Sequence, residues 1–437
     1  MSITHEVPLR STRAASRRGA FHLPQSLRWW LAVLTVLAVG SWVNFALHLL
    51  QGGTYQPADP AVATAPACKK PPTPLGPHEI VEGPWGRLEM VPITIAPPLE
   101  CLWQASGNEL YETAWFFPKT NKARLTTRLA ELGLSEPLQA ELLLRAKADP
   151  SIDGHTIRPS KELVLKLSPE DRAKLYVELH GYPENKAQSE AFRFCGTSSE
   201  PWFGDAPILP ETKRLVESLI YRRGGFMFFA DRRTIEPMLP SDQERLALIR
   251  ALTRESTWML NLKISAETDV DALVRYWGRG GRTEQLRPIL EALTRLPGKQ
   301  SLEVSRLLPP FARQRIFTYM PSSSLASAVV HDCHWSATNF FSQQPEERLG
   351  KGNTVFDIFA KDYYRIYGNP QFGDIVIYFD EHEGVIHSAV YIAADVVFTK
   401  NGHTCARPWM FLKAEDMKHY YPRTKGLRQT YFRRKGM

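Results

Sequence analysis

The stretch FGDIVIYFDEHEGVIHSAVYIAADVVFTKNG, residues 372–402, decides the fold of the C-terminal part of this chain. DIVIYF and IHSAVYIA are rich in β-branched and aromatic residues, and the polar turn DEHEG separates them. A third apolar segment, VVFTKN, follows after a short turn. The pattern predicts three consecutive antiparallel strands, that is, a meander. Alternation with a period of two places His387, on the second strand, on the same side as Ala389 and Tyr391.

A cysteine lies upstream of this meander, at a predicted helix start. HDCHWSATNFF, residues 331–341, places Cys333 just before an apolar-periodic run, so we expect the thiol at a helix N-terminus. The N–H groups and the dipole of a helix N-terminus favour a thiolate and can hold a developing oxyanion. An imidazole can accept the thiol proton and later return it to the leaving amine. We predict that Cys333 and His387 form a catalytic pair; the alternative is a buried or disulfide-bonded cysteine.

Two residues of the third strand could orient the imidazole. Thr399 and Asn401 alternate along the strand, and both are predicted to point the same way as His387. Four other histidines lack such a placement and are predicted to lie in loops: His331, His334, His382 and His403.

These residues resemble the NlpC-type family of papain-like cysteine peptidases, which cut amide bonds in bacterial cell-wall peptides. The family has Asp-Cys at a helix start, Gly-Asp opening a strand, His opening the next strand, and a third polar residue farther along. The matching residues here are Asp332, Cys333, Gly373, Asp374, His387 and then Thr399 or Asn401. The resemblance covers about residues 315–420. It implies thiolate attack on an amide carbonyl, an acyl-enzyme, and hydrolysis.

The resemblance also implies where substrate would bind. Tyr319 lies near the place of a family tyrosine that lines the cleft, and Asp332 and Trp335 are expected beside the substrate. The usual Ser-Gly after Asp-Cys is His334-Trp335 here, which crowds the oxyanion side. Thr399 has the family's spacing and Asn401 has the better orienting chemistry, so both stay candidates.

The N-terminal part predicts a membrane anchor. Residues 29–50 are 22 residues without a charge, enough for a helix to cross a hydrocarbon core of about 30 Å. A cleavable signal peptide would have a shorter apolar core. Five arginines precede the segment against one glutamate, which predicts a cytoplasmic tail, 1–28, and an extracytoplasmic, periplasmic or cell-surface bulk. Residues 29–50 would contact the lipid bilayer.

Between anchor and C-terminal domain we expect three regions. Residues 51–84 are rich in proline and predict an extended stalk, and residues 85–212 have mainly helical patterns. Residues 213–314 contain two similar segments, from Ala251 and from Ala292, that each run from a helix end into a strand. With FMFFAD from Phe226 they predict a small parallel α/β repeat layer. The segments YRRGGF and YWGRGGR could bind an anionic group or end helices.

The predicted fold is therefore α/β or α+β, with a papain-like hydrolase domain at 315–437. A peptide or peptidoglycan substrate follows from the resemblance. The net charge of +8 is spread among acidic residues, so nucleic acid is not an expected partner. No zinc-type spacing occurs, and neither metal nor cofactor is expected. The alternatives are a transglutaminase-like acyltransferase and a non-catalytic papain-fold binding or scaffold protein.

The chain has five cysteines, an odd number that leaves at least one unpaired in an oxidising compartment. We predict a disulfide between Cys68 and Cys101, at the junction of stalk and domain, and a structural or disulfide role for Cys405.

Overall fold

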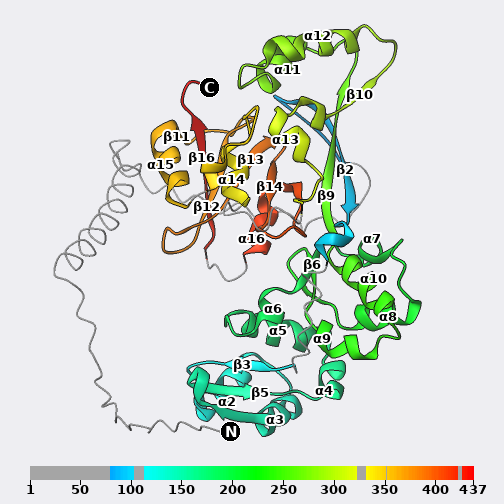
Figure 1. Cartoon of the computed structure of the whole chain (residues 1–437), viewed down its shortest axis with the longest axis vertical. Coiled ribbons are helices and arrows are strands. Elements are labelled where there is room, and N and C mark those ends of the chain that lie inside the picture. Colours follow the sequence, from blue (N-terminus) through cyan, green and yellow to red (C-terminus); the bar gives the residue numbers. More distant parts are fainter. Residues whose placement is uncertain (1–78, 103–112, 322–330, 351, 422–425) are drawn as a thin grey trace, which may run out of the picture. The chain divides into compact units, whose positions relative to one another are not determined.

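The computed structural model describes residues 79–102, 113–321, 331–350, 352–421 and 426–437 (Figure 1). The expected anchor at 29–50, most of the expected stalk and Cys68 lie outside these residues. Within the described part, no helix combines the length and the apolar character that a membrane crossing requires. The described residues mix helices and strands, which confirms the α+β class.

The C-terminal part forms a six-stranded sheet in which all neighbouring strands are antiparallel. In spatial order the strands are β11 (Tyr363–Ile366), β16 (Arg428–Arg434), β12 (Ile375–Phe379), β13 (Val385–Ala393), β14 (Val396–Lys400) and β15 (Trp409–Lys413). The predicted meander is confirmed as β12, β13 and β14. Its first turn is closed by Asp380, whose Oδ1 accepts hydrogen bonds from the backbone N–H groups of His382 (2.9 Å) and Gly384 (2.6 Å).

The two faces of this sheet pack against different parts of the chain. On one face, Val390, Ile392 and Phe398 share a core with α14 (Cys333–Thr338) and the residues after it, and the rings of Phe340 and Phe398 are 5.6 Å apart. α15 (Gly352–Asp362) follows α14 and leads into β11. The other face contributes Ala389, Tyr391 and Val397 to a second core, together with residues of α16 (Met417–Tyr420). A side chain on one face of the sheet therefore meets α14, and a side chain on the other face meets α16.

A second, four-stranded sheet corrects the predicted parallel layer. Its order is β1 (Glu79–Gly83), β2 (Gly86–Ile95), β9 (Glu255–Ile264) and β10 (Gln300–Glu303), and every pair is antiparallel. The long strands β2 and β9 lie side by side in Figure 1. The two similar segments do run from helix ends into β9 and β10. Two helices, α11 (Val270–Trp277) and α12 (Thr283–Thr294), connect these strands, and the chain returns in the opposite direction.

FMFFAD belongs to a different sheet. Its strand β8 (Phe226–Phe229) pairs antiparallel with β6 (Phe192–Cys195) and β7 (Tyr221–Arg223), and Gly224 lies in the β7–β8 turn with φ +58°. The first glycine-rich segment is therefore a hairpin turn rather than a helix end. The second follows α11, whose C-cap is Gly278.

The stretch expected to be mainly helical also contains short strands. A three-stranded sheet has the order β3 (Trp115–Phe117), β5 (Gly154–Ile157) and β4 (Ala146–Asp149). Besides α11 and α12, the α-helices described before the C-terminal domain are α2 (Lys122–Glu131), α3 (Glu136–Arg145), α4 (Lys161–Lys166), α5 (Pro169–His180), α6 (Lys186–Ser189), α7 (Glu200–Phe203), α8 (Pro210–Ser218), α9 (Arg232–Ile235), α10 (Asp242–Leu252) and α13 (Pro310–Arg315).

Candidate active site

Cys333 is the first residue of α14, as the sequence predicts. Asp332 is the N-cap, and its Oδ1 accepts a hydrogen bond from the backbone N–H of Trp335 at 2.9 Å. An aspartate in this position satisfies an otherwise unpaired helix donor and so fixes where the helix begins. Cys333 is a free thiol, and 8% of its surface is exposed.

The surroundings of the thiol act on its ionisation in opposite directions. Burial, together with the negative charge of Asp332, raises the pKa of Cys333 to about 12. Backbone N–H groups of Ser388, His334 and Cys333 itself stabilise the thiolate and lower this pKa. The raising effects win, so the thiol is protonated at neutral pH. The same N–H groups point to where a developing oxyanion could be held.

His387 is fully buried, and both of its ring nitrogens have partners. Nε2 lies 2.7 Å from Thr399 Oγ1, and Nδ1 lies 2.7 Å from the hydroxyl of Tyr421. Thr399 in turn donates a hydrogen bond of 3.3 Å to Asn401 Oδ1. If Thr399 uses its proton on Asn401, it must accept the Nε2 proton, which leaves the Nδ1 lone pair to accept from Tyr421. Burial lowers the pKa of His387 well below its usual 6.5, so the imidazole is neutral.

Thr399 and Asn401 therefore divide the orienting role that the sequence left open. Thr399 contacts the imidazole, and Asn401 acts through Thr399. Asn401 Nδ2 is buried and has no hydrogen-bond partner among the described residues.

The cysteine and the histidine approach the same strand from different sides. His334 Nδ1 lies 2.8 Å from Ser388 Oγ, so Ser388 faces α14, while alternation turns His387 to the other face. The β13–β14 pairing runs from Val390–Phe398 to Ala393–Val396, and no pairing is recorded at the level of Ser388. The described residues include no hydrogen bond between Cys333 and His387. Tyr421 holds the nitrogen that such a bond would use.

Two further groups beside the thiol escaped the sequence analysis. His334, predicted to lie in a loop, is the second residue of α14, and burial lowers its pKa. Lys400 is fully buried and donates hydrogen bonds to the carbonyls of Gly402 (2.7 Å) and Thr404 (3.0 Å). Burial lowers the pKa of Lys400 to about 8, while the charges of Asp332 and Cys333 raise it. The sequence carries a signal for each of these groups. His334 directly follows the cysteine, and Lys400 is a charged residue at the end of an apolar strand.

The residues expected to bind substrate take different places. Trp335 is fully buried and stacks on His331, with ring centroids 4.1 Å apart, so packing is its role here. Its place beside the substrate stays a prediction. Tyr319 is half-buried, and its hydroxyl has no hydrogen-bond partner among the described residues. Asp374 is buried and accepts two hydrogen bonds from Arg433 (2.9 and 2.7 Å), so it holds β12 to β16.

Three consecutive residues form a possible metal-ligand group. Ligand atoms of Asp332, Cys333 and His334 all lie within 4.8 Å of one another. Two of them already have partners within the protein: Asp332 Oδ1 caps α14 and His334 Nδ1 contacts Ser388. These contacts explain the group as the helix cap and its surroundings.

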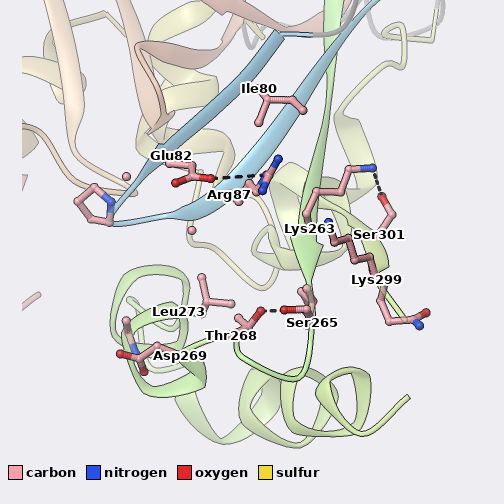
Figure 2. A pocket seen from close by; sticks show the side chains of 16 residues that line it. Ile80, Glu82, Arg87, Lys263, Ser265, Thr268, Asp269, Leu273, Lys299 and Ser301 are labelled. Carbon is pink, nitrogen blue, oxygen red and sulfur yellow. Dashed lines mark hydrogen bonds and ion pairs between the residues drawn. The ribbon is translucent and has the colours of Figure 1, made fainter. Parts of the chain in front are cut away.

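A well-formed pocket in the described part lies away from this chemistry. It has a volume of about 600 Å³ and is lined by the β1–β2 hairpin and the ends of β9, β10 and α11 (Figure 2). Its charges are largely balanced: Arg87 pairs with Glu82 at 3.6 Å, and Lys263 pairs with Glu89 at 2.7 Å. No residue of the Cys333 site lines it. The candidate site is therefore selected by the chemistry of Cys333 and not by this pocket.

Comparisons with known proteins were made at the levels of family, sequence and structure. None of them gives a match: no family model, no curated protein and no solved structure resembles this chain closely enough. The functional argument therefore depends on the residues themselves.

Proposed function

We propose that this chain is a membrane-anchored extracytoplasmic cysteine hydrolase that cleaves amide bonds, with cell-wall peptides as the first substrates to test. One observation carries the proposal. The free thiol of Cys333 is surrounded by backbone N–H groups, one of which belongs to Ser388. Ser388 directly follows His387, and His387 is hydrogen-bonded to Thr399. The anchor, the location and the substrate rest on the sequence alone.

The chemistry follows from which groups carry protons. His387 is neutral but faces away from α14, so its Nδ1 can act as a base for Cys333 only once the Tyr421 hydroxyl moves away and the imidazole turns towards the thiol, or through that hydroxyl as a proton relay. The thiolate then attacks the amide carbonyl, and the backbone N–H groups of Cys333 and Ser388, which approach the sulfur, are the candidates to bind the oxyanion. The proton returns from the imidazole to the leaving amine, and water hydrolyses the thioester. Thr399 keeps Nε2 protonated throughout.

The test is turnover of peptidoglycan fragments by the full chain in detergent, with product analysis by mass spectrometry. We expect Cys333→Ala and His387→Ala each to reduce the rate by at least roughly 100-fold, the lower range for loss of a positioned proton-transfer group. Cys195→Ser is the matched control, because Cys195 is a free cysteine outside the site. Full activity of Cys333→Ala would contradict the proposal. Products that incorporate an added amine would instead indicate an acyltransferase.

A second candidate function is a papain-fold binding or scaffold protein without catalysis. Two observations favour it specifically: the pKa of Cys333 is raised to about 12, and both nitrogens of His387 are occupied. The two functions differ in how Cys333 reacts. A catalytic thiol should become more reactive when substrate peptide is added, whereas a structural thiol should become no more reactive than before.

A further inference from the structure

Arg193 is a cation that its surroundings do not neutralise. It lies on β6, and its guanidinium stacks over the ring of Tyr420, with Cζ 4.0 Å from the ring centroid. Its Nε is buried without a hydrogen-bond partner, and no described carboxylate forms an ion pair with it. Burial lowers the pKa of Arg193. The side chain as a whole is half-buried, so its terminal guanidinium nitrogens stay open to an anion from solution.

The nearby acidic group is already engaged. Glu255 is buried and forms an ion pair with Arg407 through Oε1, while its Oε2 accepts a hydrogen bond from Tyr420 at 3.4 Å. The charge of Glu255 reaches Arg193 only as a lesser effect on its pKa, after burial, Arg407 and Tyr420. Arg193 thus has donors to spare, because neither of the two buried carboxylates of this region, Glu255 and Asp416, forms an ion pair with it among the described residues.

Two consecutive tyrosines connect this cation with the candidate active site. Tyr420, under the guanidinium, is followed in the chain by Tyr421, whose hydroxyl holds His387 Nδ1 at 2.7 Å. The pKa of Tyr421 is raised by burial and by the negative charge of Cys333, and it is lowered by the positive charge of Arg193. Cys333 and Arg193 therefore both lie within electrostatic reach of one phenol. The unpartnered hydroxyl of Tyr319 also lies near Arg407.

We propose that Arg193 binds a carboxylate of the substrate beside Cys333, so that the acyl compounds this site accepts are acidic ones. A guanidinium offers a fork of N–H donors that matches a carboxylate, and the aromatic ring behind it holds its plane in place. This assignment rests on the proposed function, because the bound carboxylate belongs to a substrate only if the chain is a hydrolase. Arg193 comes from a strand far from the C-terminal domain in sequence, which makes the middle region part of the specificity.

The test uses two alkylating reagents that differ in charge. Iodoacetate and iodoacetamide react with a thiolate in the same way: the sulfur–carbon bond forms, iodide leaves, and the thiol proton goes to solvent. We measure both rates at Cys333 by peptide mass spectrometry on the full chain, and we compare their ratio with that of glutathione. We expect Cys333 to favour iodoacetate, and Arg193→Gln to lower the iodoacetate rate roughly tenfold with the iodoacetamide rate nearly unchanged. Arg193→Lys should retain part of the preference.

Arg222→Gln is the matched control, since Arg222 lies on β7 of the same sheet and is exposed. It should leave both rates unchanged. A wild-type ratio equal to that of glutathione, or an unaltered ratio in Arg193→Gln, would overturn the proposal. The wild-type comparison needs no variant, so a folding failure of Arg193→Gln does not remove the test.

A binding measurement covers the case in which Cys333 does not react with either reagent. Calorimetry with N-acetylglutamate and N-acetylglutamine should show tighter binding of the acidic compound, and Arg193→Gln should abolish the difference. Equal binding of the two by the wild-type protein would refute the carboxylate site. Preferred binding of the acid without any turnover would leave the site standing and refute the hydrolase instead.

Discussion

At the scale of single residues, the chemistry of the site depends on the two hydroxyl groups that bind the His387 imidazole, Thr399 at Nε2 and Tyr421 at Nδ1. The order of Cys333, His387 and Thr399 could be predicted from the sequence, because helix caps and strand alternation are local properties. Tyr421 could not, since it reaches His387 from beyond β15 and no local pattern marks it. The raised pKa of Cys333 was also unpredictable, because burial depends on the packing of distant residues.

Replacing Tyr421 by phenylalanine should activate the thiol. The change removes the hydrogen bond to His387 Nδ1 and leaves the ring in place, which frees the lone pair to accept the Cys333 proton. A neutral hydrogen bond contributes about 0.5–1.5 kcal/mol, so we expect alkylation of Cys333 by iodoacetamide to rise roughly 2- to 10-fold at pH 7. Tyr431→Phe, which alters a tyrosine of β16, should have no such effect. A slower reaction in Tyr421→Phe would show that the phenol relays the proton.

The buried histidine also predicts how stability depends on pH. Burial keeps the pKa of His387 in the folded state well below 6.5, so the unfolded chain gains a proton there that the folded chain does not. The free energy of unfolding should therefore fall as the pH drops below about 6.5, the ordinary histidine value. The pKa of His334 is also lowered by burial, so the free energy of unfolding of the wild type should fall by more than His387 alone would cause. Urea midpoints at pH 7 and pH 5 measure this, and His387→Gln should show a smaller difference. An unchanged difference would contradict the assignment.

At the scale of elements, local sequence signals predicted where strands lie, but they did not predict the direction in which neighbouring strands run. The strands β12, β13 and β14 were predicted because each is bounded by its own turn. The strands β9 and β10 were also found, but their parallel arrangement was wrong. A strand-helix-strand pattern implies a parallel pair when one helix makes the crossover, and here α11 and α12 together reverse the chain. Cys101 was expected to pair with Cys68, which lies outside the described residues, and the structure brings Cys101 close to Cys405.

We expect a disulfide between Cys101 and Cys405. Both are buried, Cys405 Sγ lies 3.7 Å from the carbonyl oxygen of Cys101, and burial together with a hydrogen bond with Cys405 raises the pKa of Cys101. Oxidised glutathione during refolding supplies the oxidant and takes up the two electrons, and the two thiol protons go to solvent. The bond should raise the free energy of unfolding by about 2–4 kcal/mol. Non-reducing peptide mapping should find this pair and leave Cys333 free; a bond from Cys101 to Cys68 would contradict it.

At the scale of the whole molecule, the C-terminal sheet shares its core with the middle region. Leu88 of β2 and Leu260 of β9 belong to the same apolar cluster as Val390 and Phe411. Thr257 Oγ1 donates to the carbonyl of Phe411 at 2.9 Å, and the hydroxyl of Tyr276 donates to the carbonyl of Ile392 at 2.8 Å. The sequence predicted a domain boundary near residue 315, because sequence patterns indicate helices and strands but not the contacts between them.

This shared core predicts that residues 315–437 do not fold alone, while residues 79–437 do. In the shorter fragment, the side chains that pack against β2, β9 and α11 would face water, and each large apolar side chain loses about 1.5–3 kcal/mol of burial. Folded domains have only about 5–15 kcal/mol in reserve, so a few such losses suffice. Thermal unfolding followed by near-ultraviolet circular dichroism should give a cooperative transition for 79–437 and none for 315–437. The shorter fragment should also bind a hydrophobic dye. A sharp transition in 315–437 would show that the hydrolase-like part is an independent domain, and Arg193 would then lie outside the unit that carries Cys333.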